Sequence, residues 1–134
     1  MAKKLNYTYA VGKRRTSSAR IRLFHGKGEN TVNGMTLEKY FPGAINKSKW
    51  SKPFSITETS DKYYFSAKVM GGGKQGQIDA VIQGLSKALA KIKPDKFRIP
   101  LKKVGLLTRD SRIRERRKIG MGGKARRKKQ SPKR

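Results

Sequence analysis

The chain has 134 residues, of which 35 are Lys or Arg and only eight are Asp or Glu, so its formal net charge at pH 7 is +27. Cysteine is absent and histidine occurs once, which excludes disulfides and thiolate metal sites. No apolar run approaches the ~18 residues of a membrane-spanning helix, and the N-terminus lacks the apolar segment of a signal peptide, so we expect a soluble intracellular protein.

The first predicted elements are two strands that form a hairpin. Residues 7–11 and 17–24 alternate with a period of two, and the second stretch carries its apolar residues on one face. The short cationic linker GKRRTSS, residues 12–18, joins them. We expect a basic ridge with three cations at the hairpin tip and two on a strand face: Lys13, Arg14, Arg15, Arg20 and Arg22.

A short strand and a brief helix are predicted after a glycine-containing turn. The sequence NTVNG, residues 30–34, is typical of a short strand bounded by turn residues. Thr36 is placed to cap a helix that runs through Tyr40, because a threonine side chain can accept a hydrogen bond from the first helical turn. The dipeptide Pro-Gly at residues 42–43 then ends this helix.

Two further strands are predicted in the middle of the chain. Residues 44–50 fit neither period, but Phe54–Thr57 and Tyr63–Met70 predict an antiparallel pair around the polar turn TSDK. The second of these strands places four apolar side chains on one face, namely Tyr63, Phe65, Ala67 and Val69. With the hairpin and the short strand, the sheet reaches four to five strands.

The clearest predicted helix follows the glycines at residues 71–73 and ends before Pro94. Its apolar residues recur at steps of three and four, which is typical of a helix with one buried face: Ile78, Val81, Ile82, Leu85, Leu89 and Ile92. Five polar residues are expected to face away from it: Asp79, Gln83, Ser86, Lys87 and Lys91. A shorter helix is predicted from Pro100 to Leu107. Packing of the long helix on the sheet predicts an α+β fold, with a mainly antiparallel sheet of four to five strands backed by helices.

The last 26 residues predict a cationic arm. Arg109–Arg134 contains thirteen Lys or Arg and two acidic residues, and the apolar periodicity disappears after Thr108. Such a segment cannot bury a core of its own, so we expect a globular domain at residues 1–108 and an extended tail at residues 109–134. Both parts are basic, and cations of this density favour a nucleic-acid partner because they neutralise phosphates.

The sequence GGGKQG at residues 71–76 allows three interpretations. It satisfies the G-x-G-x-x-G pattern of dinucleotide-binding loops, but no apolar parallel strand follows its helix, so a nucleotide cofactor is disfavoured. A simple helix-entry turn is one alternative. The other, which we favour because of the basic surroundings, is contact with a nucleic-acid phosphate through exposed amides and Lys74.

No catalytic or metal-binding constellation is present in the sequence. His25 stands beside Gly26 without a second His or Cys, which indicates a turn residue, and the acidic residues are scattered among cations. We therefore expect no enzyme activity, no cofactor and no metal. The aromatic residues at strand spacing favour packing over base stacking, although an RNA-recognition sheet would need them on its open face: Tyr7, Tyr9, Tyr63 and Phe65.

Five blocks of the sequence, taken in order, resemble the family of small-subunit ribosomal protein nine of the bacterial type. They span nearly the whole chain and are YAVGKRRTSSARIRL, VNGMTLEKYFP, MGGGKQGQ, LKKVGLLTRDSR and KARRKKQSPKR. Their combination is far more specific than any single block. One departure is Pro132, which stands between Ser131 and the final Lys-Arg pair where the family commonly has Ser-Lys-Arg.

The resemblance implies a fold of the ribosomal-protein-five second-domain type and a place in the head of the small subunit, in the cytoplasm. The partners that it implies are small-subunit ribosomal RNA, the peptidyl-site tRNA and neighbouring head proteins. Together with the charge pattern, it predicts an rRNA-binding set: Lys13, Arg14, Arg15, Arg20, Arg22, Lys74, Arg109, Arg112, Arg114, Arg116, Arg117 and Lys118. It also implies a tRNA-binding set in the tail: Arg126, Arg127, Lys128, Lys129, Lys133 and Arg134.

Two alternatives remain open at this stage. The terminal sequence SPKR resembles the Ser-Pro-Lys repeats of linker-histone tails, which favours a DNA-binding architectural protein of the nucleoid, although it occurs once. A basic amphipathic protein can also lie on an anionic membrane, but the arm offers too few apolar residues for that role, and we expect no membrane partner.

Overall fold

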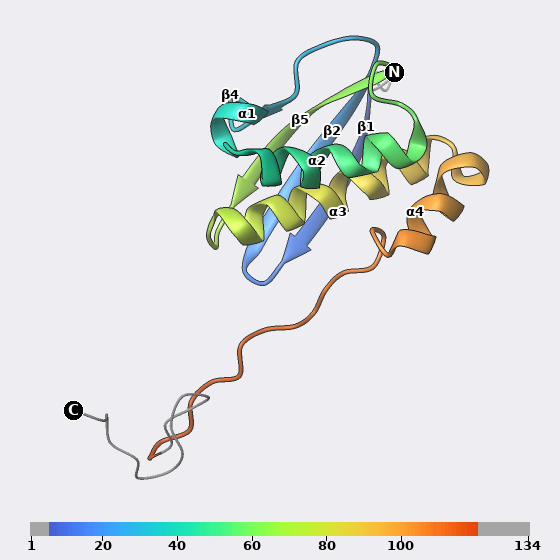
Figure 1. Ribbon diagram of the computed structural model, residues 1–134. Coiled ribbons are helices and arrows are strands. Elements are labelled where there is room, and N and C mark those ends of the chain that lie inside the picture. The colour runs from blue at the N-terminus through green and yellow to red at the C-terminus, as the bar shows by residue number, and fades with distance from the viewer. Residues whose placement is uncertain (1–5, 121–134) are drawn as a thin grey trace, which may run out of the picture.

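The computed structural model describes residues 6–120, which form a five-stranded sheet with helices on one side (Figure 1). The strands are β1 Tyr7–Arg14, β2 Ser17–His25, β3 Thr31–Val32, β4 Met35–Thr36 and β5 Tyr63–Met70, in the spatial order β1-β2-β5-β3-β4. The helices are α1 Leu37–Tyr40, α2 Ala44–Thr57, α3 Lys74–Ile92, the π-helical turn η1 Pro94–Arg98, and α4 Ile99–Val104. All strand pairs are antiparallel except β3 with β5, so the predicted α+β class and mainly antiparallel sheet are confirmed.

The predicted hairpin is confirmed, but its tip is shorter than expected. Strand pairing continues until Arg14 lies opposite Ser17, so the turn consists of Arg15 and Thr16 alone. Arg15 adopts a left-handed φ of 52°. Lys13 and Arg14 therefore belong to β1 rather than to the tip, and strand alternation sends their side chains to opposite faces of the sheet.

The short strand predicted at residues 30–34 is present as β3 and continues into a second hairpin. Asn33 and Gly34 have φ angles of 51° and 81°, which is the two-residue turn that Asn-Gly sequences favour. The Asn33 side chain pairs with the backbone of Val69 at 2.9 and 3.1 Å. This contact fixes the β3–β4 hairpin against the end of β5.

The strand predicted at Phe54–Thr57 is wrong, because these residues form the last turn of α2, which also includes the unassigned residues 44–50. Trp50, Phe54 and Thr57 recur at helical spacing and face the interior. The Phe54 ring stacks on Phe65 with 6.1 Å between ring centroids. This tertiary contact selects the helix over the local strand preference of the sequence FSIT.

The core lies between α3 and the sheet, as the periodicity predicts. Ile78, Val81, Leu85 and Leu89 are at most 1% exposed and pack on the apolar sides of β1, β2 and β5. Full burial of each such side chain stabilises the fold by about 1.5 to 3 kcal/mol. α3 begins at Lys74 after the glycines and ends before Pro94, as expected.

The polar side of α3 is not wholly solvent-facing, which corrects the expectation for Gln83 and Ser86, whereas Lys87 and Lys91 are exposed as predicted. Gln83 and Ser86 are buried. Gln83 Oε1 accepts from the backbone N–H of Lys13 at 2.8 Å, and the Nζ atoms of Lys87 and Lys91 donate to the carbonyls of Val11 and Tyr9 at 3.4 and 2.8 Å. Side chains spaced four apart on α3 thus satisfy the free edge of β1, which protects that edge from pairing with another chain.

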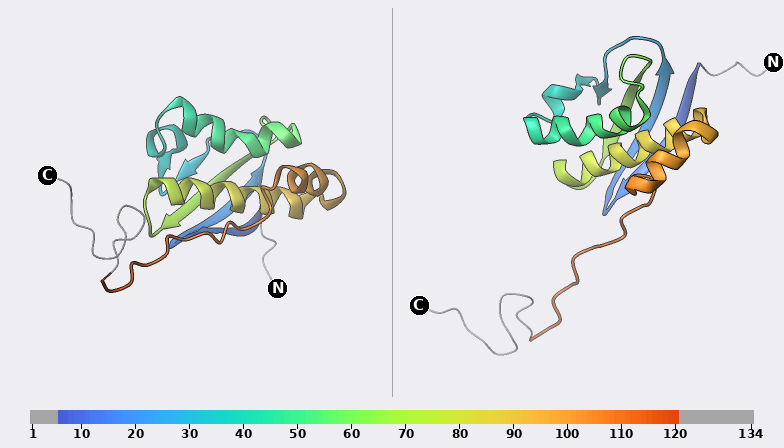
Figure 2. Two further views of the ribbon diagram at one scale, coloured as in Figure 1. Left: turned by 60° about the horizontal axis from the view of Figure 1, so that its bottom comes forward. Right: turned by 45° about the vertical axis from the view of Figure 1, so that its right-hand side comes forward.

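The helices cover one face of the sheet, and no element of residues 6–120 covers the other (Figure 2). The short helix predicted from Pro100 to Leu107 is α4, but it starts at Ile99 and stops at Val104, because Gly105 adopts a left-handed φ of 82°. Residues 109–118 have no regular structure and lead away from the body. Within the described part of the chain, no helix is long and apolar enough to cross a membrane.

Candidate nucleic-acid interface

The uncovered face of the sheet is cationic. Strand alternation brings Lys13, Arg20, Arg22 and Lys68 to this face, and all four are exposed. Arg20 on β2 lies directly opposite Lys68 on β5. Strands β1, β2 and β5 contain no acidic residue, so no carboxylate within these three strands neutralises the four cations. Three of the five cations of the predicted basic ridge, Lys13, Arg20 and Arg22, thus lie on this surface, whereas Arg15 is in the hairpin turn and Arg14 lies on the helix-covered side.

The aromatic residues divide between the two faces. Tyr63 and Phe65 are buried in the core, as favoured from the sequence, but Tyr7 and Tyr9 lie on the uncovered face. There Tyr7, Phe24 and Tyr64 form a row across three strands, with centroid separations of 5.7 and 5.1 Å. The Arg22 guanidinium lies 5.2 Å from the Tyr7 ring centroid, which holds this cation close to the sheet.

The glycine turn before α3 has a clear structural role. Gly71 and Gly72 adopt left-handed φ angles of 75° and 61°, and a Cβ atom on Gly72 would lie 2.1 Å from the Ser17 hydroxyl oxygen. Ser17 Oγ also donates to the carbonyl of Gly71 at 3.0 Å. These glycines therefore allow the turn to pack on the β1–β2 hairpin, which supports the helix-entry interpretation.

Lys74, at the start of α3, is already engaged by Tyr40. Its Nζ donates to the Tyr40 carbonyl at 2.8 Å and lies 3.9 Å from the centroid of the same ring. The Tyr40 hydroxyl donates to Gln77 Oε1 at 2.7 Å. The Lys74 side chain remains exposed, and its contact with a phosphate stays a prediction.

Arg14 lies on the helix-covered side of the sheet and holds the start of the C-terminal segment. Its side chain is only 11% exposed. Nη1 donates to the backbone carbonyls of Asp110 and Arg112 at 3.1 and 2.8 Å, and it also lies 3.1 Å from the Asp110 carboxylate. Asp79 on α3 approaches Nε at 3.7 Å. Arg14 thus positions the chain that follows α4, a role that its neighbours in the sequence do not suggest.

Asp110 and Arg112 close this junction. The Asp110 carboxylate accepts from the Arg112 guanidinium at 2.7 and 2.9 Å and from its backbone N–H at 3.0 Å. These hydrogen bonds hold the pKa of the Asp110 carboxyl well below its usual range, and those to the side chain raise the pKa of Arg112. The sequence TRDSR contains a signal for this local clamp of Asp110 and Arg112, because an aspartate two residues before an arginine can accept hydrogen bonds from the backbone N–H and the guanidinium of that arginine.

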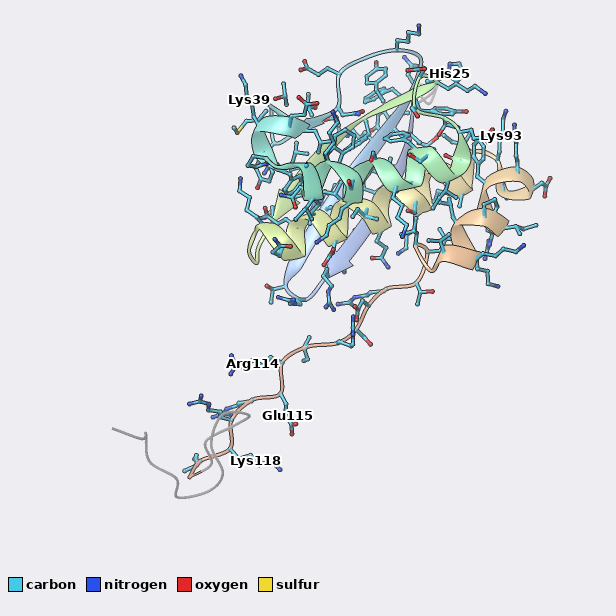
Figure 3. The ribbon with its side chains drawn as sticks, in the orientation of Figure 1. His25, Lys39, Lys93, Arg114, Glu115 and Lys118 are labelled. Carbon is cyan, nitrogen blue, oxygen red and sulfur yellow. The ribbon has the colours of Figure 1, made fainter. Side chains whose placement is uncertain are left out.

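The remaining predicted rRNA-binding residues differ in setting. Arg15 is exposed in the hairpin turn, and Arg109 is exposed before the clamp. The side chains of Arg114, Glu115 and Lys118 project from the extended segment, which lies away from the body (Figure 3). Arg116 and Arg117 are exposed in the same segment. The predicted tRNA-binding set lies outside the described residues: Arg126, Arg127, Lys128, Lys129, Lys133 and Arg134.

Residues 6–120 hold no cluster typical of metal binding. No group of three His, Cys, Asp or Glu side chains in this range is placed to hold a metal ion. His25 is the last residue of β2 rather than a turn residue, and its ring packs edge-on against Tyr63 at 5.2 Å. The groups that this surface exposes are cationic side chains and the ring of Tyr9.

Comparison with known proteins gives one family throughout. Residues 12–134 match the family described as ribosomal protein S9/S16. The chain is 48% identical to "Small ribosomal subunit protein uS9" of Rickettsia rickettsii (strain Sheila Smith), over 94% of this chain and 78% of the relative. It is 44% identical to the protein of the same name from Desulfotalea psychrophila, over 86% of this chain and 88% of the relative.

Proposed function

Because the chain belongs to the ribosomal protein S9/S16 family, we propose that it binds small-subunit ribosomal RNA through its basic surface and contacts the peptidyl-site tRNA through its C-terminal segment. Membership itself makes the chain a structural constituent of the small ribosomal subunit, with ribosomal RNA and ribosomal proteins as partners in the cytoplasm. Members of this family are not enzymes. Membership of this family also favours the ribosomal function over the alternative of a DNA-binding architectural protein of the nucleoid.

The rRNA contact is supported by the uncovered sheet face, where exposed cations stand on three strands without a carboxylate. A folded RNA offers dense phosphates, and each cation that neutralises one releases condensed counterions, so affinity should fall steeply with salt. On the sheet, we assign the rRNA contacts to Arg20, Arg22 and Lys13. Arg15 in the hairpin turn and Lys74 at the start of α3 add two more exposed cations. The segment after α4 supplies the rest of the set: Arg109, Arg112, Arg114, Arg116, Arg117 and Lys118.

The tRNA contact rests on the division of the chain into a docking domain, residues 1–108, and a tail, residues 109–134. The observation that carries it is the anchorage of Asp110 and Arg112 by Arg14, because it fixes where the tail leaves the body. A cationic segment that starts from a fixed point and orders on RNA can reach a partner that the domain cannot. We assign the tRNA contact to the tail cations Arg126, Arg127, Lys128, Lys129, Lys133 and Arg134.

Deletion of residues 124–134 tests the tail. We expect the truncated chain to assemble into small subunits, because the domain and the Arg14 anchorage remain, and to lower the affinity of peptidyl-site tRNA. Sedimentation measures assembly, and filter binding of aminoacyl-tRNA to the reconstituted subunits measures affinity. Each lost phosphate contact should also reduce the slope of log affinity against log salt by about 0.7 to 0.9.

A matched control separates position from charge. Lys102→Gln and Lys103→Gln remove two exposed cations from α4, and we expect them to leave tRNA affinity unchanged. The double variant Lys133→Gln, Arg134→Gln removes the same charge from the terminus and should weaken binding. If the parent, the Lys102/Lys103 variant and the Lys133/Arg134 variant bound peptidyl-site tRNA with equal affinity at several salt concentrations, the tRNA contact would be contradicted. That result would leave the proposed rRNA contact unaffected.

A further inference from the structure

A trough crosses the uncovered sheet face between β1 and the β3–β4 turn. Its volume is about 790 Å³, within the range of about 300–1,000 Å³ that small-ligand sites occupy. Its lining contains three cations and no acidic residue: Tyr9, Arg20, Arg22, Asn33, Gly34, Ser66, Ala67, Lys68 and Val69. A trough with this charge is suited to a phosphate-bearing ligand.

Tyr9 is the aromatic group of this trough with a free surface. The rings of Tyr7, Phe24 and Tyr64 contact one another in the neighbouring row, and the backbone of Gly28 lies against the Tyr64 ring. The Arg22 guanidinium lies over Tyr7, not over Tyr9. Tyr9 is 42% exposed, so part of its side chain is open to a ligand in the trough.

The wall opposite Tyr9 is held rigidly in place. Asn33 donates its backbone N–H to the Ala67 carbonyl at 2.9 Å, and its side chain pairs with both backbone groups of Val69. Gly34, with a φ of 81° and open space where a Cβ would stand, leaves this wall free of a side chain. The trough therefore combines a preformed backbone wall, a cationic floor at Arg20 and Lys68, and an aromatic side.

We infer that this trough binds an unpaired nucleotide of RNA, with the base stacked on Tyr9 and the flanking phosphate on Arg20 and Lys68. This inference rests on the proposed binding of ribosomal RNA and specifies which RNA the sheet face takes. A duplex keeps its bases stacked on one another and presents only backbone, whereas an unpaired base offers a free ring face to an aromatic side chain. The aromatic side of the trough thus adds affinity only for unpaired RNA.

The test uses the full-length chain, a short unstructured oligoribonucleotide and a duplex RNA with the same number of phosphates. We expect Tyr9→Ala to weaken binding of the single strand by about 5- to 150-fold, the range that loss of one stacked base gives. Tyr9→Phe keeps the ring and should retain the affinity. Binding of the duplex should be unchanged in both variants, because phosphate contacts elsewhere on the chain are intact.

A local readout identifies the site independently of the cationic tail. An oligoribonucleotide carrying 5-iodouridine is irradiated with the protein, and mass spectrometry locates the crosslinked residue. A crosslink at Tyr9 that the duplex does not give supports the inference. RNA binding without a crosslink at Tyr9, or an equal crosslink from the duplex, overturns the inference but not the proposed function. A wild-type chain that binds neither RNA contradicts the proposed function itself.

Discussion

Arg14 on β1 and Asp110 beyond α4 are 96 positions apart in sequence, yet the Arg14 guanidinium donates to the Asp110 backbone carbonyl at 3.1 Å. The same nitrogen reaches the Arg112 carbonyl at 2.8 Å. An arginine at the end of the first hairpin strand thus determines where the C-terminal segment leaves the domain. Nη1 serves both carbonyls and the Asp110 carboxylate, while Nε of the same guanidinium lies 3.7 Å from Asp79 on α3.

We expect Arg14→Lys to loosen this junction, although it keeps the charge. A lysine side chain has a single nitrogen, so it cannot keep the contact with Asp79 and those with the segment after α4 at the same time, and a lost hydrogen bond to a charged group costs about 1.5–3 kcal/mol. Because the chain has no cysteine, Ser60→Cys and Ser111→Cys introduce two spin labels at exposed positions. The distance distribution between them should be narrow in the parent and broad in the Arg14→Lys variant.

Arg15→Lys serves as the matched control, because Arg15 neighbours Arg14 but is exposed in the turn. Its distance distribution should equal that of the parent. If Arg14→Lys also left the distribution narrow, the anchorage would have to come from another contact.

The Asp110 carboxyl should titrate below its ordinary pKa of 3.8. Arg112 donates hydrogen bonds that favour the charged form, so this pair stabilises the junction above pH ~3.8, and the contribution is lost as pH falls through the lowered pKa. Carbon-detected NMR of the Asp110 side chain measures the midpoint directly. Arg112→Gln should move the midpoint up toward the ordinary value, and an unchanged midpoint would show that Arg112 is not the cause.

The sequence predicted the hairpin, β5 and α3 because each repeats its period over five residues or more. It failed at Phe54–Thr57, where four residues fit a strand and a helix equally well and the stacking of Phe54 on Phe65 decides between them. Contacts between residues far apart in the chain could likewise not be predicted from the sequence. The clamp of Asp110 and Arg112 is local, but the part that Arg14 plays depends on where β1 ends relative to α4.

The sequence predicted the cations of the candidate interface but only part of the geometry in which they are arranged. Alternation along β2 placed Arg20 and Arg22 on one face correctly, since their neighbours in the strand are buried. The same alternation did not reveal that Tyr9 borders a trough, because the Asn33-Gly34 turn that forms the opposite wall comes from another hairpin. Pairing between β3 and β5 brings these residues together, and no local pattern encodes it.

Gly12→Ala should destabilise the fold strongly. A Cβ on Gly12 would lie 1.9 Å from the Ala80 carbonyl oxygen and 2.4 Å from the Gly84 nitrogen, and both are backbone atoms of α3 that cannot rotate away. Overpacking of this kind costs about 1–3 kcal/mol and occasionally more, and we expect the upper end. Urea denaturation followed by circular dichroism gives the free energy of unfolding.

Gly73→Ala is the control for the loss of a glycine, because nothing lies within 4 Å of its Cβ position and its φ is not positive. Gly73 is the N-cap residue of α3, where alanine is less favourable than glycine, so the free energy of unfolding of this variant should fall by about 0.5–1 kcal/mol, less than that of Gly12→Ala. Equal stability of Gly12→Ala and the parent would show that α3 crosses β1 less closely than the structure has it.

The final prediction concerns the salt dependence of RNA binding by the sheet face. Arg20→Gln removes one exposed cation beside Lys68, and if Arg20 contacts a phosphate, the slope of log affinity against log salt should fall by about 0.7 to 0.9. Lys52→Gln removes one exposed cation from α2, on the opposite side of the sheet, and should leave the slope unchanged. Fluorescence anisotropy with a small-subunit RNA fragment at four salt concentrations measures both slopes. The same slope for the two variants would place the RNA on the helix side or on the tail alone, because only a phosphate seated on the uncovered face distinguishes Arg20 from Lys52.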